Sequence, residues 1–150
     1  MPKFSDWSLA QLKDAHPDLR RVCERVIEVW DFRVLQAYRS PEEQQRAFEQ
    51  GRSKARPGQS PHNYYPALAV DLWPYPVDWA DLNRARVFAG YFLGVAQELG
   101  VDLVWGGDWH SELRLIGSDK RRRHTFDDFP HFELREWREL RSKSERSDGI

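Results

Sequence analysis

The segment HPDLRRVCERVIEVW, residues 16–30, constrains the fold most, because it carries one continuous apolar face. Its apolar residues recur at the spacing of an α-helix: Leu19, Val22, Cys23, Val26, Ile27 and Trp30. Pro17 suits the first turn of such a helix. A helix that is apolar on one side has to pack against another element, so we expect a layered domain built around this face. Cys23 is then a small buried hydrophobic residue.

Short helical and strand-like segments make up the rest of the chain. We predict helices over residues 8–15, 40–51 and 78–100, strands over 31–40, 67–73, 101–105 and 130–134, and a hairpin strand over 112–117. Ser40 and Glu43 form a capping box for the helix at 40–51, and Asp78 is the expected N-cap of the helix at 78–100. The expected buried face of the helix at 78–100 consists of Leu82, Ala85, Ala89, Phe92, Leu93, Ala96 and Leu99. This order predicts an α+β fold, with helices packed on a small, mostly antiparallel sheet.

The size and charge of the chain favour a single soluble domain, and we expect a monomer. A chain of 150 residues can build one sizeable core, which we place at 1–140, followed by a polar, frayed tail at 141–150. The net charge of −1 creates no field that favours nucleic acid, and no stretch approaches the roughly 18 apolar residues of a membrane span. The first residues lack the apolar stretch of a signal peptide, so we expect synthesis in the cytosol.

Histidines and carboxylates are the residues that point to chemistry. The segment SPHNYYPALAVDLWP, residues 60–74, places His62 before an apolar strand and Asp71 inside it, and His131 follows Asp128 by three residues. Two histidines and a carboxylate with one open position make a catalytic zinc site, and a second carboxylate can take a proton from water. A carboxylate in an apolar strand needs a partner, and a metal ion is one. Spacing alone leaves the alternative open that each histidine is a surface or hydrogen-bonded core residue.

Four pieces of the chain occur together in one order: HPDLRRV, FRVLQAYRS, SPHNYYPALAVDL, and WGGDW followed by DDFPHFEL. In this the sequence resembles the zinc peptidases of the D-Ala-D-Ala carboxypeptidase class, and within them the L-alanyl-D-glutamate peptidase branch found in phage endolysins. The branch has the pattern SxH, then AxD, then a late DxxH. The matching residues are Ser60, His62, Ala69, Asp71, Asp128 and His131.

The resemblance implies a single zinc-peptidase domain that cuts peptidoglycan stem peptides at the L-alanyl-D-glutamate bond. The implied Zn²⁺ ligands are His62, Asp71 and His131. Asp128 would be the catalytic carboxylate, and we prefer it to the adjacent Asp127 because it lies three residues before His131. Arg39 matches the arginine that steadies the substrate carbonyl as it becomes an oxyanion, and Ser60 would hydrogen-bond to a ligand or to substrate.

The loop between the first two implied ligands departs from the family pattern. The family has HxxGxAxD, with seven residues from histidine to aspartate, whereas His62 and Asp71 are nine apart. Tyr65-Pro66-Ala67 stands where the family glycine is expected. We therefore expect the loop to bulge by two residues, which a surface loop accommodates at little cost.

Other residues near these motifs have two readings each. Glu133 shares a strand face with His131, and it either orients that ring or forms an ordinary salt bridge. Asp108 either supports the site or caps a turn. Three tryptophans either wall a cleft or belong to the core: Trp73, Trp105 and Trp109.

The segment before Asp128 is longer than in the family, and it adds His110 and His124, for which we expect no ligand role. The KRRR run at 120–123 is either a solvated loop or a patch that attracts anionic wall polymer. Three functional alternatives remain: a D,D-carboxypeptidase or dipeptidase with the same ligands, a non-catalytic wall-binding module, and a DNA-binding module that uses KRRR. The lack of a signal peptide fits a phage lysis enzyme that reaches the wall after holin-type release.

Overall fold

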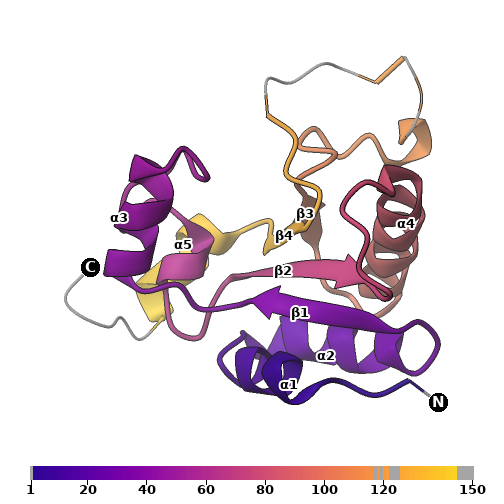
Figure 1. Cartoon of the computed structure of the whole chain (residues 1–150), viewed down its shortest axis with the longest axis horizontal. Helices are drawn as coiled ribbons and strands as arrows, with labels where there is room; N and C mark the ends of the chain where they lie inside the picture. Colours follow the sequence, from indigo (N-terminus) through magenta and orange to yellow (C-terminus); the bar gives the residue numbers. More distant parts are fainter. Residues whose placement is uncertain (1, 117, 119, 122–125, 145–150) are drawn as a thin grey trace.

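The computed structural model describes residues 2–116, 118, 120–121 and 126–144 (Figure 1). Its helices are α1 (Asp6–Lys13), α2 (Pro17–Ile27), α3 (Pro41–Glu49), α4 (Leu82–Glu98) and α5 (Trp137–Leu140). Its strands are β1 (Phe32–Gln36), β2 (Ala69–Pro74), β3 (Leu103–Trp105) and β4 (His131–Leu134). Short 3₁₀ turns occupy Pro61–Asn63, Leu113–Leu115 and Arg141–Lys143. The strands form one sheet in the order β1-β2-β4-β3, and every neighbouring pair is antiparallel, so the predicted α+β fold is confirmed.

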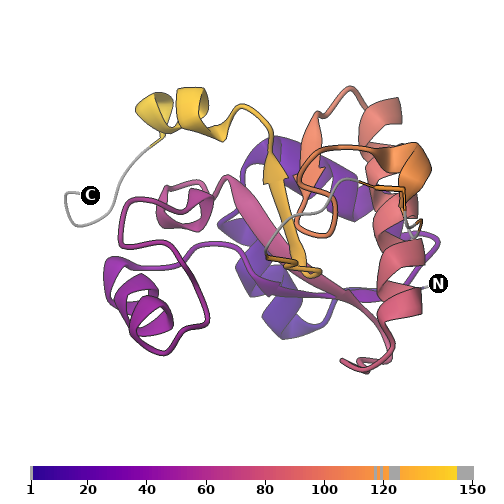
Figure 2. The same ribbon diagram turned by 90° about the horizontal axis from the view of Figure 1, so that it is seen from above.

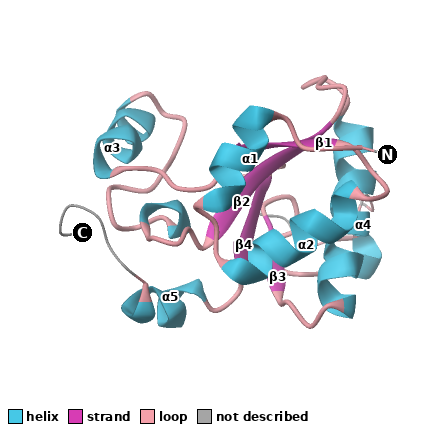
Figure 3. Cartoon of the chain, turned by 90° about the horizontal axis from the view of Figure 1, so that it is seen from below, coloured by secondary structure: helices cyan, strands magenta, loops and turns pink. Residues whose placement is uncertain are grey.

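Helix α2 forms where its apolar face predicted it. Pro17 occupies the first turn, and the His16 ring nitrogen Nδ1 accepts a hydrogen bond from the Asp18 backbone N–H. Five residues of the predicted face are buried: Leu19, Val22, Cys23, Val26 and Ile27. Figure 3 shows α1 and α2 together in front of the strands, with α4 beside them. Burial raises the pKa of the Cys23 thiol, so this cysteine is a packing residue rather than a nucleophile.

The sheet has one apolar and one polar face, because strand side chains alternate. Val70 and Leu72 of β2 belong to the hydrophobic core, as does Phe132 of β4. The residues between them, Asp71 on β2 and His131 on β4, point to the other face and are direct cross-strand partners. The apolar face is thus covered by helices, and the polar face is left to carry a site. Figure 2 shows α3 and α5 beyond the end of the sheet where β2 begins and β4 ends.

Two local predictions were wrong. Helix α4 begins at Leu82 with Asp81 as its N-cap, whereas Asp78 accepts a hydrogen bond from the Ala80 backbone N–H in the preceding turn. Leu82 is therefore exposed, and Phe88, absent from the predicted face, is buried instead. The expected strand at 112–117 contains a 3₁₀ turn, because its printed backbone hydrogen bonds are local: Leu115 N–H to Glu112 O and Ile116 N–H to Leu113 O.

Several other predictions fall partly outside the described residues. These are His124, the last two arginines of KRRR and residues 145–150 of the expected tail. Within the described ranges, no helix combines the length and the apolar character needed to cross a bilayer.

Candidate metal centre

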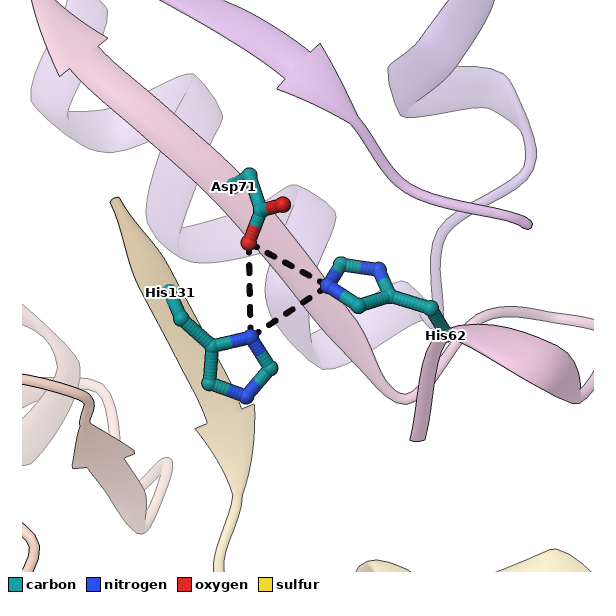
Figure 4. Close-up of side chains that lie close together, drawn as sticks. All are labelled: His62, Asp71 and His131. Atoms are coloured by element: carbon teal, nitrogen blue, oxygen red, sulfur yellow. Dashed lines mark hydrogen bonds and ion pairs between the residues drawn. The ribbon is translucent and has the colours of Figure 1, made fainter. Parts of the chain in front are cut away.

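Three side chains bring one ligand atom each to a common point on the polar face of the sheet (Figure 4). Asp71 comes from β2, His131 from the facing position of β4, and His62 from the Pro61–Asn63 turn. His62 Nε2 lies 3.2 Å from Asp71 Oδ1, His131 Nδ1 lies 3.3 Å from the same oxygen, and the two nitrogens are 3.3 Å apart. Both histidines are buried, which makes this a prepared cluster rather than a chance surface contact.

The loop from 62 to 71 is docked on the junction between α1 and α2. Ala67 donates its backbone N–H to the Asp14 carbonyl at 2.8 Å, and the Tyr65 hydroxyl donates to the Asp14 carboxylate at 3.2 Å. Leu68 then donates its N–H to the Pro61 carbonyl at 3.0 Å, which closes the loop. The nine-residue spacing does not keep the histidine and the aspartate apart, since His62 Nε2 lies 3.2 Å from Asp71 Oδ1.

The hydrogen bond of the outer nitrogen of each ring determines which nitrogen carries the hydrogen. His62 Nδ1 lies 2.7 Å from the Ala37 carbonyl oxygen, which only accepts, so Nδ1 carries the hydrogen. His131 Nε2 lies 2.7 Å from a Glu133 carboxylate oxygen and donates to it in the same way. Both rings therefore present a lone pair inward, beside the negative oxygen of Asp71. When both rings are neutral, the three inward atoms are all acceptors, which is an arrangement that suits a positive ion.

The pKa shifts of the cluster show that its residues also favour positive charge at this point. Burial alone would raise the pKa of Asp71, but the two imidazole rings outweigh it and hold the pKa of this carboxyl well below its usual range. Burial alone would lower the pKa of His131, but its hydrogen bonds with Asp71 and Glu133 outweigh burial and raise that pKa to about 10. The cluster thus stabilises positive charge.

The spacing of the three atoms fits a tetrahedral metal ion. Ligand bonds of about 2.0 Å place the atoms of a tetrahedron about 3.3 Å apart, and the three distances here are 3.2, 3.3 and 3.3 Å. Two imidazole nitrogens and one carboxylate oxygen form a donor set that suits zinc. The cluster can therefore hold a metal ion while leaving one tetrahedral position open.

Asp128 lies beside the cluster on the segment that leads into β4. Its backbone N–H donates to the Gly106 carbonyl at 2.9 Å, and Gly106 donates to the His131 carbonyl at 2.8 Å. A methyl group on Gly106 would overlap the Asp128 carbonyl, so only glycine permits this approach. Burial and the negative charge of Asp71 raise the pKa of the Asp128 carboxyl, and they outweigh the positive charges nearby. A carboxyl with a raised pKa is suited to taking up and releasing a proton.

Arg39 lies next to Oδ2 of Asp71, the carboxylate oxygen that the two histidines do not contact. Its Nε donates to Gln36 at 2.8 Å, one guanidinium nitrogen donates to Gln44 at 3.1 Å, and the other lies 3.5 Å from Asp71 Oδ2. The backbone of Arg39 is also fixed, because its N–H donates to the His62 carbonyl at 2.8 Å. A rigid cation is therefore held next to the His62–Asp71–His131 cluster.

An open cleft of about 820 Å³ contains the three clustered residues together with Asp128, Arg39 and Ser60. These residues therefore share one accessible surface.

The similarity of the chain to known proteins identifies its family. The family of phage L-alanyl-D-glutamate peptidases matches the chain over residues 1–135. The chain belongs to this family. The resemblance inferred from the sequence motifs is confirmed, and the protein is a peptidase.

Two members of the group illustrate how far the similarity of this peptidase extends. The L-alanyl-D-glutamate peptidase of Escherichia phage T5 is 30% identical over 131 residues, which cover 83% of this chain and 93% of the phage protein. The crystal structure of the Serratia marcescens L-Ala D-Glu endopeptidase ChiX superposes with a TM-score of 0.66 at 26% identity. That match covers 88% of this chain and 90% of ChiX, so nearly the whole fold is shared.

The remaining predicted site residues of this peptidase lie at three different places. The Ser60 hydroxyl accepts a hydrogen bond from the His62 backbone N–H at 3.2 Å, so it supports a residue of the cluster. Glu133 contacts His131 as the strand parity predicted. Asp108 is buried and caps a turn by accepting from the Glu112 backbone N–H at 3.0 Å, and it does not line the cleft.

Of the two interpretations given for Trp105, the structure supports the core one, and the ring does not line the cleft. Its ring is buried, stacks on Phe129 with centroids 5.4 Å apart, and donates its indole N–H to the Phe129 carbonyl. Trp73 is also buried and packs against Trp79 rather than the cleft. Trp109 does line the cleft, with its ring centroid 5.6 Å from that of His131.

Sequence reasoning missed two buried amides that hold the cleft wall of this peptidase together. Gln44 of α3 is fully buried, and its oxygen accepts hydrogen bonds from Arg39 at 3.1 Å and from Asn63 at 3.2 Å. Its nitrogen donates to Ser53 at 3.0 Å and to the Ala55 carbonyl at 2.7 Å. The available signal was the position of Gln44 one turn before Ala47, the other fully buried residue of α3.

Replacing Gln44 with methionine is expected to lower the free energy of unfolding by about 2–4 kcal/mol, because buried partners lose their hydrogen bonds. Urea unfolding followed by circular dichroism measures the change. Gln45→Met is the matched control, since Gln45 donates to Glu49 at an exposed position of the same helix. We expect that variant to stay within about 0.5 kcal/mol of the wild type. Equal stability losses in both variants would contradict the role given to Gln44.

Proposed function

We propose that this peptidase is a zinc-dependent endopeptidase that hydrolyses the L-alanyl-D-glutamate bond of peptidoglycan stem peptides. The observation that carries the proposal is the triangle of inward lone pairs, 3.2–3.3 Å on a side, with Asp128 next to it. Membership of a family named for this bond supplies the substrate. We propose that residues 1–140 form the catalytic domain, that the enzyme is a monomer, and that it reaches the cell wall after holin-type release.

The zinc ion would be held by His62, Asp71 and His131. When bound, zinc acts as a Lewis acid and lowers the pKa of a coordinated water molecule to about 7. Glu133 keeps the inward nitrogen of His131 free of a proton by accepting the hydrogen of the outer nitrogen. Ser60 fixes the start of the turn that carries His62.

Asp128 and Arg39 would carry the steps that the protein itself performs. The Asp128 carboxylate accepts a proton from the attacking water molecule and then delivers it to the nitrogen of the departing D-glutamate residue. Its raised pKa favours the protonated form that the second step needs. The Arg39 nitrogen nearest to Asp71 bears two hydrogens, and Asp71 uses one of them at the long distance of 3.5 Å. The other is available to the substrate carbonyl oxygen as it becomes negative.

Digestion of purified peptidoglycan tests the bond that is cut. We expect new D-glutamate amino termini, identified by mass spectrometry of the released fragments after amine labelling. Free D-alanine or a D-alanyl dipeptide in place of these termini would instead support the D,D-carboxypeptidase or dipeptidase alternative. Binding to the wall without any new amino termini would support the non-catalytic module.

A further inference from the structure

The cleft is rich in cations for a chain whose net charge is −1. Its lining includes five cationic residues: Arg39, Arg52, Lys54, Arg135 and Arg138. Three carboxylates oppose them: Asp71, Asp128 and Glu133. All three lie at or beside the metal-ligating cluster, and a bound divalent ion would offset two of their charges. The remaining positive charge indicates a substrate that brings negative charge of its own.

The five cations differ in how firmly the protein binds them. Arg39 is held by Gln36, Gln44 and Asp71. Arg135 is paired with Asp102 at 3.0 Å and also donates to Ser111. Lys54 is exposed, and in the part of the chain that the structure describes no carboxylate lies within ion-pair distance of its ammonium group. Its charge is therefore available to a ligand.

Lys54 lies against the segment that carries the proposed proton donor. Its ammonium nitrogen lies 5.0 Å from the centre of the Phe126 ring, which attracts the cation and limits its freedom. Phe126 precedes Asp128 by two residues, and its carbonyl accepts the indole N–H of Trp109. The segment that carries Asp128 is thus anchored to the cleft wall, and Lys54 lies against the same segment from the loop after α3.

The substrate has a matching anion at this place. In the proposed reaction Asp128 protonates the nitrogen of the departing D-glutamate residue. A glutamate joined to the next residue through one of its carboxyl groups keeps the other as a free carboxylate, a few bonds from that nitrogen. We propose that Lys54 binds this free carboxylate and makes the enzyme prefer substrates in which it is not amidated. This inference rests on the proposed function.

Two synthetic stem peptides test the inference with the full-length, zinc-loaded enzyme. One contains D-glutamate with its free carboxylate, and in the other this group is a neutral carboxamide. We expect the wild type to show a kcat/KM about tenfold higher on the first peptide, as one charge-assisted hydrogen bond allows. The difference should appear mainly in KM, because the carboxylate has the same charge before and during the reaction. In Lys54→Gln the ratio should fall close to one, and in Lys54→Arg it should be kept.

Arg138→Gln is the matched control, because it removes a cation that also lines the cleft but stacks on Trp137 of α5. This variant should keep the tenfold ratio. The inference is overturned by a wild-type ratio near one, by an unchanged ratio in Lys54→Gln, or by an equal loss in Arg138→Gln. Failure of the wild type to cleave either peptide would overturn the proposed function itself, and this inference with it.

Discussion

His131→Ala is expected to lose both bound zinc and hydrolysis of the L-alanyl-D-glutamate bond. The variant removes the ring nitrogen that lies 3.3 Å from both the Asp71 oxygen and the His62 nitrogen. Two protein ligands then remain of the three that a catalytic zinc site has beside its open fourth position. Changes to residues that merely support a ligand cost 10–100-fold in affinity or activity, so loss of a ligand should exceed about 100-fold. The Glu133 carboxylate also loses its buried partner.

Metal analysis of the purified proteins by mass spectrometry, together with the rate of peptide cleavage, measures both effects. The wild type should contain one zinc per chain and the variant almost none. His110→Ala is the control, since His110 is exposed and does not line the cleft. That variant should keep zinc and activity. A wild-type protein that neither carries zinc nor regains activity on zinc addition would contradict the metal assignment.

The fold was predictable wherever a single segment determines its own structure. The face of α2 follows from the 3.6-residue period, and the capping box of α3 follows from Ser40 and Glu43, whose reciprocal hydrogen bonds are present. The start of α4 was not predictable in this way. Asp78 and Asp81 are both acceptable N-caps, and the choice depends on the turn that carries the chain away from β2. The local sequence allows either residue to cap the helix, and tertiary packing determines which of the two does so.

The proposed site was predictable to the extent that short motifs carry it. The resemblance named His62, Asp71 and His131, and the structure brings them together. The residues that hold them in place come from distant parts of the chain. Gln44 contacts the cleft wall through α3, and Gly106 approaches Asp128 across more than twenty residues. No spacing rule connects such pairs, because they meet only after the sheet has formed.

Trp105 shows that a motif can leave the place of a side chain open: the sequence allowed both the cleft wall and the core, and the structure places the ring in the core. It lies within WGGDW, next to residues that shape the cleft, and aromatic rings are common in clefts. Burial against Phe129 and Phe132 is decided by which face of β3 the ring occupies. Strand parity could have indicated this, but the three residues of β3 are all buried and give no alternation to read.

Asp128→Asn is expected to reduce kcat by about 10²–10⁴-fold while leaving zinc content and stability close to those of the wild type. The amide keeps the size of the side chain and its place beside the cluster, but it can neither accept a proton from water nor deliver one to the departing nitrogen. In the part of the chain that the structure describes, no side chain forms a hydrogen bond with the Asp128 carboxylate, so its removal leaves no buried partner unsatisfied.

Asp127→Asn is the matched control, because Asp127 is the exposed neighbour of Asp128 and is absent from the cleft lining. Steady-state cleavage of a stem peptide and metal analysis of the three proteins separate the outcomes. Loss of activity in Asp127→Asn with Asp128→Asn unaffected would reverse the assignment of the two aspartates. Full activity in both variants would show that neither carboxylate moves a proton. Loss of activity with zinc retained in Asp128→Asn alone would distinguish catalysis from metal binding, because a wall-binding module that only holds zinc has no use for a proton acceptor beside it.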